Sequence, residues 1–327
     1  MYIMKKLLSL ILALTLIVTC LSGVCFAADP IAIVTNGEFT KEVFTLDELL
    51  AGVKATGLTQ IKMLTDLDRV VESGTGQIVI PYTCTIDLNG HTWSTAKCAS
   101  GNAMAFNISG SDSSHSVVKN GTILGATMGI RASKGSLEVQ NCTIVAPTSV
   151  AVGIYGTDKT ETWMNLIKDS TLIAGGSAVF SWHSDKNDQA DMTMKIENSR
   201  LIQTNPESYA IFTRNAGPSS VEIGENVEVY SAGNLCIDTV KMTGTALNIV
   251  DGAHTVEANG QKYEGLKKWT TEVPKVVEPA APAAPSVPTT PIPDAEVPKT
   301  GMSVLALGSM AMASLAGAVL SKKRRIH

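Results

Sequence analysis

Apolar and polar residues follow a motif that recurs along the middle of the chain. The motif is Val or Ile, any residue, Asn or Asp, a small residue, any residue, then Ile or Leu, and its copies start 21, 28 and 29 residues apart. The four copies are "VKNGTI" (118–123), "VQNCTI" (139–144), "IKDSTL" (167–172) and "IENSRL" (196–201). A repeat of this length is typical of a stacked architecture in which each repeat forms one coil.

Each position of the motif has a predicted place in its coil. Alternate residues of a strand face opposite ways, so the first and last residues of the motif are expected to stack inside. These interior residues are Val118, Val139, Ile167 and Ile196 at the start, and Ile123, Ile144, Leu172 and Leu201 at the end. The residues expected at a bend, where stacked amides bond from coil to coil, are Asn120, Asn141, Asp169 and Asn198. The small residues that follow in a tight turn are Gly121, Cys142, Ser170 and Ser199.

Less regular relatives of the motif extend the stack in both directions. Looser copies are expected at Asn226 and Asp251, and the upstream segment "IDLNGHTW" (86–93) keeps an Asn-Gly turn with shifted apolar positions. A second apolar strand precedes each copy, at Ala105-Phe106, Gly129-Ile130, Gly153-Ile154, Val179-Phe180, Ile211-Phe212 and Cys236-Ile237. Two or more short parallel strands per coil predict a solenoid with a continuous apolar interior.

The ends of a solenoid expose unpaired strand edges and need covers. Residues 44–57 read as a short amphipathic helix, in which Thr45 is the N-cap, Glu48 completes a capping box and Gly57 ends the helix. The best candidate for the C-terminal cover is "GQKYEGLKKW" (260–269).

Together these features resemble the right-handed parallel β-helix of the pectate-lyase-like superfamily, over roughly residues 60 to 260. The segment "IDLNGHT" is similar to a coil found in many exported bacterial surface proteins. The predicted fold class is therefore all-β: a right-handed parallel β-helix solenoid with a short N-terminal capping helix, then a disordered Pro-rich stalk and a C-terminal hydrophobic helix.

The N-terminal residues predict export. Residues 1–28 contain a basic start, an apolar stretch and small residues near Ala28, which are the three parts of a secretory signal peptide. Lipoprotein processing at a cysteine of this segment is the alternative, but Thr19 and Val24 are poor residues before a lipidated cysteine.

The C-terminal segment resembles the cell-wall sorting signal of Gram-positive surface proteins, which is Leu-Pro-any-Thr-Gly, an apolar stretch and basic residues. The corresponding residues are Val297, Pro298, Lys299, Thr300 and Gly301, with Val297 in place of the leucine. Uncharged residues 302–320 follow, and at ~1.5 Å each they reach roughly 28 Å, close to the thickness of a bilayer. The resemblance implies that a sortase transpeptidase joins Thr300 to peptidoglycan or its precursor. An ordinary C-terminal membrane anchor is the alternative.

Charge and proline content complete the predicted organisation. Without the six basic residues of the two terminal segments, 20 basic and 30 acidic residues remain, a net charge of −10 that disfavours nucleic acid as a partner. Eight of the 13 prolines lie between Pro274 and Pro298, a stretch that reaches at most roughly 78 Å as polyproline II. The predicted domains are a signal peptide (1–28), an N-terminal cap with a short helix (29–77), a parallel β-helix (78–262), a C-terminal cap remnant with a wall-spanning linker (263–296) and a sorting signal with a transmembrane tail (297–327).

Three polar loops are expected to leave successive coils side by side and to carry the binding site: 156–163, 181–191 and 213–220. The candidate ligand-binding residues are Trp163, Trp182, His183, Asp185, Asp188, Asp191 and Arg214. Tryptophan rings stack on sugar faces, so a glycan or host-surface ligand is expected. The alternative is three solvated turns with incidental aromatics. Asp185, Asn187 and Asp191 also suggest Ca²⁺, although Ala190 stands where a calcium loop needs glycine.

No catalytic residue is predicted. Many β-helix proteins cleave polysaccharides with clustered carboxylates, but the outward column beside the bend is mixed: Lys119, Gln140, Lys168 and Glu197. His91 beside Asp87 offers an acid/base pair, for which a structural turn is the plainer interpretation. The favoured function is thus an adhesin-like protein displayed on the cell wall, and the alternative is a surface-anchored polysaccharide lyase or glycoside hydrolase.

Four cysteines remain outside the signal peptide: Cys84, Cys98, Cys142 and Cys236. Disulfides are permitted outside the cell, and four cysteines allow three full pairings. Buried free thiols are the plainer interpretation, because these cysteines lie mainly in apolar strands and a tight turn.

Overall fold

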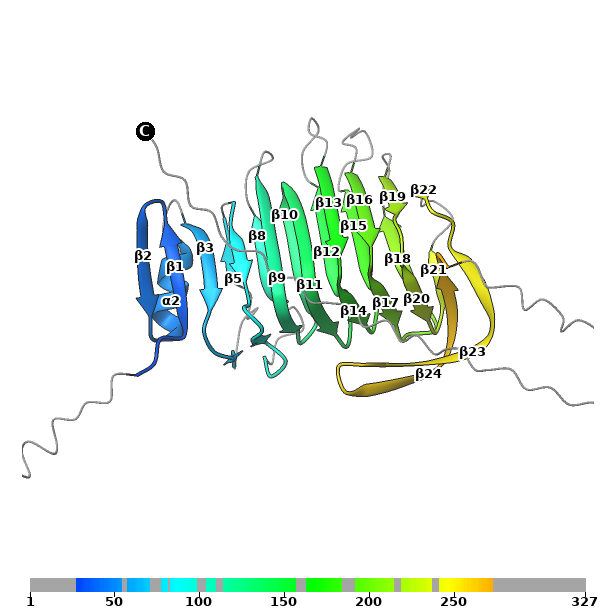
Figure 1. Cartoon of the computed structure of the whole chain (residues 1–327), viewed down its shortest axis with the longest axis horizontal. Helices are drawn as coiled ribbons and strands as arrows, with labels where there is room; N and C mark the ends of the chain where they lie inside the picture. Colours follow the sequence, from blue (N-terminus) through cyan, green and yellow to red (C-terminus); the bar gives the residue numbers. More distant parts are fainter. Residues whose placement is uncertain are drawn as a thin grey trace, which may run out of the picture. The chain divides into compact units, whose positions relative to one another are not determined.

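Strands make up most of the computed structural model, which describes residues 28–54, 58–70, 78–81, 83–98, 104–109, 114–156, 163–183, 192–214, 219–236 and 241–272. They form a seventeen-stranded and a seven-stranded sheet, both containing parallel strands, and the described residues include one helix (Figure 1). This arrangement is compatible with an all-β solenoid.

The N-terminal end is covered by an antiparallel hairpin and the helix. The elements are β1 (Ala32–Asn36), β2 (Phe39–Val43), α2 (Leu46–Lys54) and β3 (Leu58–Met63). β1 pairs antiparallel with both β2 and β3. The helix contacts all three strands and buries Leu49 and Val53, as an amphipathic helix does.

The start of α2 confirms the predicted N-cap. The backbone N–H of Glu48 donates to Thr45 Oγ1 at 3.2 Å. The Glu48 carboxylate accepts from the backbone N–H of Phe44 at 2.7 Å, one residue before the N–H that a capping box uses. The predicted end of the helix, Gly57, lies outside the described residues.

The second apolar strand of each coil is confirmed as the seven-stranded sheet. Its strands are β5 (Ile78–Ile80), β8 (Met104–Ser109), β10 (Met128–Lys134), β12 (Val152–Gly156), β15 (Val179–His183), β18 (Tyr209–Arg214) and β21 (Asn234–Cys236). Each strand pairs in parallel with the next, so the order in the sheet follows the chain. One interior column contains Ile78, Phe106, Ile130, Val152, Val179, Ile211 and Cys236.

The seventeen-stranded sheet contains two series of parallel strands that meet at a bend in each coil. Its other strands before the C-terminal end are β4 (Leu67–Asp68), β6 (Thr85–Asp87), β7 (Thr92–Ser94), β9 (His115–Leu124), β11 (Ser136–Ala146), β13 (Trp163–Lys168), β14 (Thr171–Ala174), β16 (Met192–Glu197), β17 (Arg200–Gln203), β19 (Ser219–Ile223), β20 (Glu228–Ser231) and β22 (Lys241–Gly244). The eight predicted interior residues of the motif lie in register in two columns and are at most 1% exposed. Burying one such side chain contributes about 1.5–3 kcal/mol, so these columns stabilise the stack.

The predicted bend is also confirmed. Asn120, Asn141, Asp169 and Asn198 have φ between 46° and 61°, the left-handed conformation that Asn and Asp tolerate best. The same conformation at Asn226 confirms that looser copy of the motif.

The upstream segment 86–93 holds two more residues than the motif. Ile86 is in register with Val118, and Trp93 is in register with Ile123. The apolar positions are therefore shifted, as the sequence indicates, while the interior columns continue.

The C-terminal end is covered by a hairpin of β23 (Asn248–Ala258) and β24 (Gln261–Thr270). β24 pairs antiparallel with β20, so the predicted C-terminal cover does lie against a late coil. The prediction of a further copy of the motif at Asp251 is wrong, because β23 runs antiparallel to β24. Asn259 and Gly260, both with positive φ, form the kind of two-residue turn that reverses a chain into a hairpin.

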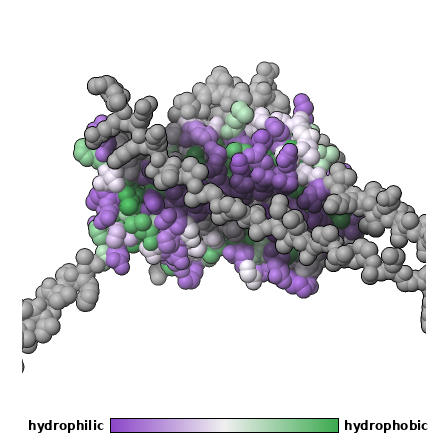
Figure 2. Space-filling view, in the orientation of Figure 1, coloured by the Kyte–Doolittle hydropathy of each residue, from purple (hydrophilic) through white to green (hydrophobic). Residues whose placement is uncertain are grey.

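Within the described ranges, no helix has both the length and the apolar character that crossing a membrane requires. The signal peptide, the Pro-rich stalk and the C-terminal hydrophobic helix that the sequence predicts all fall outside those ranges. On the face that Figure 2 shows, hydrophilic residues predominate among the coloured ones, and hydrophobic residues form smaller areas between them.

Candidate functional site

The structure places the predicted loops at neighbouring strands. The loops follow β12, β15 and β18, and the backbone pairs Gly156 with His183 and Trp182 with Arg214 (Figure 1). The strands that carry the three loops are therefore neighbours, while most of the loop residues lie outside the described residues, so their side-by-side arrangement stays a prediction.

The predicted binding residues are only partly covered by the structure. Asp185, Asp188 and Asp191 lie outside the described residues, as do Asn187 and Ala190, so the calcium hypothesis stays a prediction. For Trp163, His183 and Arg214 the structure describes the backbone but not the side chain. Trp163 opens β13 in the seventeen-stranded sheet, whereas Trp182 lies in the seven-stranded sheet, and the two are not backbone partners.

Trp182 belongs to a group of partly exposed aromatic side chains on the outer side of the seven-stranded sheet. In β12, β15 and β18, buried residues such as Val152, Val179 and Ile211 alternate with residues that face outward. We define the aromatic face as the outward residues Tyr155, Phe180, Trp182 and Phe212, together with Tyr209, whose ring lies 5.8 Å from that of Phe212, and Arg131, which lies over Tyr155.

The rings of the aromatic face contact one another along the stack. Phe180 and Phe212 are stacked, with centroids 5.5 Å apart and planes 14° apart. Tyr155 lies 5.5 Å from Phe180 and 5.7 Å from Trp182, and its plane makes 77° with that of Trp182. Trp182 thus meets its neighbour edge to face, and among the described residues no ring stacks on its plane.

A glycine and an arginine hold Tyr155 in place. A Cβ atom at Gly153 would lie 2.8 Å from Tyr155 Cε2, so only glycine leaves room for the ring to cover this position. The Arg131 guanidinium lies over the same ring at 4.3 Å from its centroid, a cation–π contact. Burial raises the pKa of Tyr155, which keeps its hydroxyl neutral at physiological pH.

The aromatic face is free of carboxylates in its own strands. The seven strands of this sheet contain Arg131, Lys134 and Arg214 but no Asp or Glu, in a chain whose net charge is −4. Arg131 Nε is buried and has no hydrogen-bond partner within the described part of the chain. The face therefore combines aromatic rings with positive charge.

Sequence reasoning missed most of this face. It named Trp182 and Arg214 but treated Phe180 and Phe212 as part of the apolar strands and overlooked Tyr155. The signal was present in "VGIYG", "VFSWH" and "YAIFTR", where bulky residues occupy the positions that alternate with the interior column.

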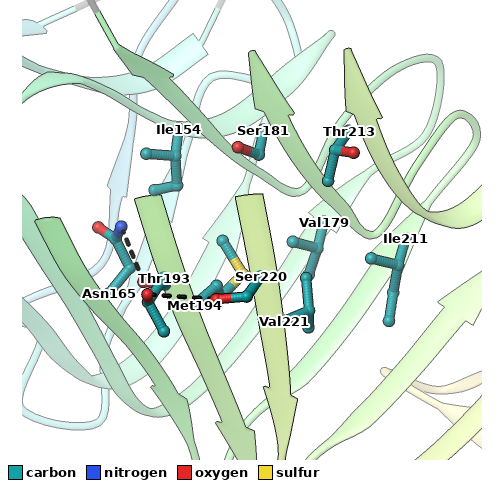
Figure 3. A pocket seen from close by; sticks show the side chains of 10 residues that line it. All are labelled: Ile154, Asn165, Val179, Ser181, Thr193, Met194, Ile211, Thr213, Ser220 and Val221. Carbon is teal, nitrogen blue, oxygen red and sulfur yellow. Dashed lines mark hydrogen bonds between the residues drawn. The ribbon is translucent and has the colours of Figure 1, made fainter. Parts of the chain in front are cut away.

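A small cavity lies inside the molecule, behind these strands (Figure 3). Ser181 and Thr213 point into it from the seven-stranded sheet, and Asn165, Thr193 and Ser220 lie across from them. Asn165 Nδ2 donates to the Thr193 carbonyl at 3.5 Å, and the hydroxyls of Thr193 and Ser220 lie 3.3 Å apart. The volume of about 10 Å³ is close to that of one water molecule, so the cavity has no room for a substrate.

The predicted outward column is confirmed as a mixed row of charged and polar side chains, in which the expected pair of Lys168 and Glu197 forms. Lys119, Gln140, Lys168 and Glu197 are in register, and Lys168 Nζ lies 3.3 Å from Glu197 Oε1. The hydrogen bond from Lys195 outweighs the other influences on Glu197 and lowers its pKa. Among the residues that the structure describes, no group of three or more His, Cys, Asp or Glu side chains is placed to hold a metal ion.

The plainer interpretation of His91, a histidine in a structural turn, is confirmed, and its carboxylate partner is Asp66 rather than Asp87. His91 Nδ1 lies 3.3 Å from Asp66 Oδ1, and Asp66 also accepts the backbone N–H of Thr92 at 2.8 Å. Asp87 accepts instead from the Asn89 backbone and from Asn120 Nδ2, at 2.9 and 3.1 Å, because its strand ends where the bend begins. Both carboxylates support the turns of the coil.

The four cysteines of the described residues are free thiols, as the sequence suggests. Burial raises the pKa of both Cys84 and Cys142 to about 12. Their thiolates are therefore scarce at neutral pH, and neither suits a nucleophile.

The comparisons with known proteins gave no match to a family model, a curated protein or a solved structure.

Proposed function

We propose that this protein is an exported surface protein, covalently anchored to the cell wall, that binds a glycan through the aromatic face. The observation that carries the proposal is the row of partly exposed rings on a parallel sheet, with Trp182 at its edge.

Glycan recognition suits the geometry of this face. Aromatic rings supply large apolar contact area with little loss of side-chain entropy, and tyrosine and tryptophan add a polar group at the rim. The apolar C–H faces of sugars match such rings, while their hydroxyls need donors of the kind that Arg131 presents. Trp182 meets Tyr155 edge to face at 77°, an arrangement that suits a sugar stacked on the plane of the indole ring.

The finer architecture belongs to the same proposal. The parallel stack supports a right-handed β-helix similar to that of the pectate-lyase-like superfamily. The Pro-rich segment then forms a disordered stalk, and a sortase transpeptidase links Thr300 to peptidoglycan before the hydrophobic C-terminal helix is discarded. The order of signal peptide, stalk, "VPKTG" and basic end in the sequence supports this part.

Binding is tested on a glycan array with purified mature protein, followed by calorimetry with the best ligand. Trp182→Ala is expected to weaken binding at least about tenfold, because hot-spot aromatics contribute 2 kcal/mol or more. Phe39→Ala is the matched control, since Phe39 is an aromatic residue on β2 that is 82% exposed and lies outside the aromatic face. Equal losses in the two variants, or cleavage of the bound polysaccharide, would overturn the proposal.

Anchoring is tested by cell fractionation. Thr300→Ala is expected to move the protein out of the fraction that only a peptidoglycan hydrolase releases. Wild-type protein that detergent alone removes from intact cells would contradict covalent attachment.

A further inference from the structure

A second surface, away from the aromatic face, has the features of a binding groove. Two hollows of about 470 and 390 Å³ follow the bend of the seventeen-stranded sheet. Both are lined by Asp169 and Thr171, so they are adjacent there. We call the two adjacent, open hollows together the bend groove. It extends from Asn120 to Asn226, four coil spacings of ~4.8 Å or roughly 19 Å.

One wall of the bend groove is a ladder of amide side chains. Asn120 Nδ2 donates to Asp87 Oδ1 at 3.1 Å, and Asn141 Nδ2 donates to Asn120 Oδ1 at 3.2 Å. Further along, Asn226 Nδ2 donates to Asn198 Oδ1 at 3.0 Å. These three amides thus donate to the residue of the preceding coil, whereas Asn198 makes no such bond to Asp169.

Asp169 interrupts this ladder at the point where the two hollows meet. A carboxylate has no N–H to donate to Asn141, so the regular bond is missing between these coils. The Asp169 side chain is exposed and makes neither a hydrogen bond nor an ion pair with any residue that the structure describes. Asparagine tolerates the same left-handed backbone and could donate to Asn141, so the bend does not require the negative charge.

The other wall carries hydroxyl groups in register. Thr122, Thr143 and Thr171 are backbone partners in successive coils. Their hydroxyls line the groove and make no hydrogen bond within the described ranges. Beyond them, Arg200 and Glu228 pair with each other at 2.9 Å, which leaves Asp169 as the unpaired charge in the middle of the groove.

We propose that the bend groove is a second binding site, distinct from the aromatic face, for an extended glycan that carries free amino groups, with an ammonium of the ligand on Asp169. The lone carboxylate selects a cation, and ammonium–carboxylate hydrogen bonds are among the strong ones. The threonine hydroxyls and amides match the hydroxyls of a polysaccharide. A peptide fits less well, because the strands beside the groove pair from coil to coil and offer no free edge for strand addition.

The test uses calorimetry with a hexamer of β-1,4-linked glucosamine, its fully N-acetylated counterpart and hexalysine, at low and physiological salt. Wild-type protein is expected to bind the glucosamine hexamer at least about tenfold more tightly than either of the others. Asp169→Asn should reduce this affinity about tenfold or more, as expected for a lost charge-assisted hydrogen bond. Asp251→Asn is the matched control, because Asp251 is exposed on β23 and outside the groove.

Each outcome decides the proposal. Equal affinity of Asp169→Asn and wild type, or no binding of the glucosamine hexamer, would overturn it. Tight binding of hexalysine would assign the site to a cationic peptide and overturn the glycan class. Trp182→Ala should leave binding of the glucosamine hexamer unchanged, so failure here is separable from failure of the aromatic face. Thermal unfolding of Asp169→Asn at or above the wild-type temperature excludes misfolding as the cause.

Discussion

The aromatic face and the bend groove are built on the same stack of coils, yet their side chains are held in different ways. In the bend, Asn120 and Asn141 are fixed by a left-handed backbone and by hydrogen bonds to neighbouring coils. On the aromatic face, Phe180 and Phe212 lie on strands and are held by ring contacts with each other and with neighbouring tyrosines. Residues of the bend thus contribute to the fold, whereas residues of the aromatic face are largely free to serve a ligand.

This difference separates two kinds of mutational effect. Substitutions in the interior, beneath both surfaces, should lower the stability of the whole stack. Substitutions in the bend should mainly lower stability, and substitutions of the outward rings should mainly weaken ligand binding. Asp169 is the exception inside the bend, because its carboxylate cannot donate the hydrogen bond that the asparagines at the equivalent positions of other coils, such as Asn141, donate to the preceding coil.

The largest effect is expected beneath both regions, at Ile144. Its side chain is fully buried, and its Cγ2 atom would lie 2.4 Å from a Cβ at Gly129 in the seven-stranded sheet, so it spans the interior. Ile144→Ala should lower the free energy of unfolding by about 2–5 kcal/mol, the cost of a cavity in a core. Denaturant titration measures this, with Ile249→Ala as control, since Ile249 is 59% exposed. Similar costs in the two variants would show that the interior columns do not hold the stack.

The next effect is confined to the bend, at Gly121. A Cβ there would lie 2.4 Å from Leu88 Cβ and 2.5 Å from the His91 carbonyl oxygen. Gly121→Ala is therefore expected to destabilise the protein by about 1–3 kcal/mol through overpacking.

Gly52→Ala is the control for Gly121→Ala, with the opposite sign. Gly52 lies inside α2, where a Cβ would meet Val34 at an ordinary 3.5 Å, and alanine favours the helix by about 0.5–1 kcal/mol. Thermal unfolding in which both variants shift the same way would contradict the assignment of Gly121 to a position that excludes side chains.

The sequence predicted the repeated interior well, for a physical reason. Residues such as Val139 and Ile144 recur because each coil needs an apolar side chain at the same interior position. The coil length therefore appears in the sequence as the spacing of the motif. The Asn positions repeat for the same reason, through the left-handed bend. Asp251 misled this reasoning, since a single Asp after an apolar run does not distinguish a coil from the Asn259-Gly260 hairpin that actually follows.

The candidate site was harder to predict. A ligand imposes no period on the chain, so Tyr155, Phe180 and Phe212 resembled ordinary apolar strand residues until the parallel register placed them side by side. The partnership of His91 with Asp66 joins residues in successive coils, so local spacing, which indicated only a turn histidine, did not reveal it. Local spacing predicted strands and turns, while contacts between coils required the structure.

A smaller effect, dependent on pH, is expected at Glu228 on β20, the strand that pairs with β24 of the C-terminal hairpin. Burial alone would raise the pKa of Glu228, but hydrogen bonds from Lys268 at 2.6 Å and from Arg200 outweigh it and hold this pKa below its usual range. Because the pKa is lowered on folding, the carboxylate stabilises the protein fully above about pH 4.3, the usual value for Glu, and less as the pH falls through the folded pKa.

Glu228→Gln should therefore cost about 1–2 kcal/mol at pH 7 and much less at pH 3. Unfolding free energies measured at both pH values check this. Glu225→Gln, at an exposed residue three positions earlier, is the control and should cost little at either pH. A cost for Glu228→Gln that stays constant between pH 7 and pH 3 would mean that its charge does not hold the hairpin.

The smallest expected change in stability is that of Asp169→Asn. It bears most directly on the comparison of the two surfaces, because it should stabilise the protein whereas the other substitutions in the bend should destabilise it. Asp169→Asn supplies the N–H that Asn141 lacks and is expected to stabilise the protein by about 0.5–1 kcal/mol, the net value of one hydrogen bond. Asp251→Asn, with the same change of charge on β23, should leave the unfolding free energy within about 0.5 kcal/mol of wild type. Paired denaturant titrations measure the difference. If Asp169→Asn destabilises the protein instead, the carboxylate serves the fold after all, and the bend loses the one position that sets it apart as a binding surface.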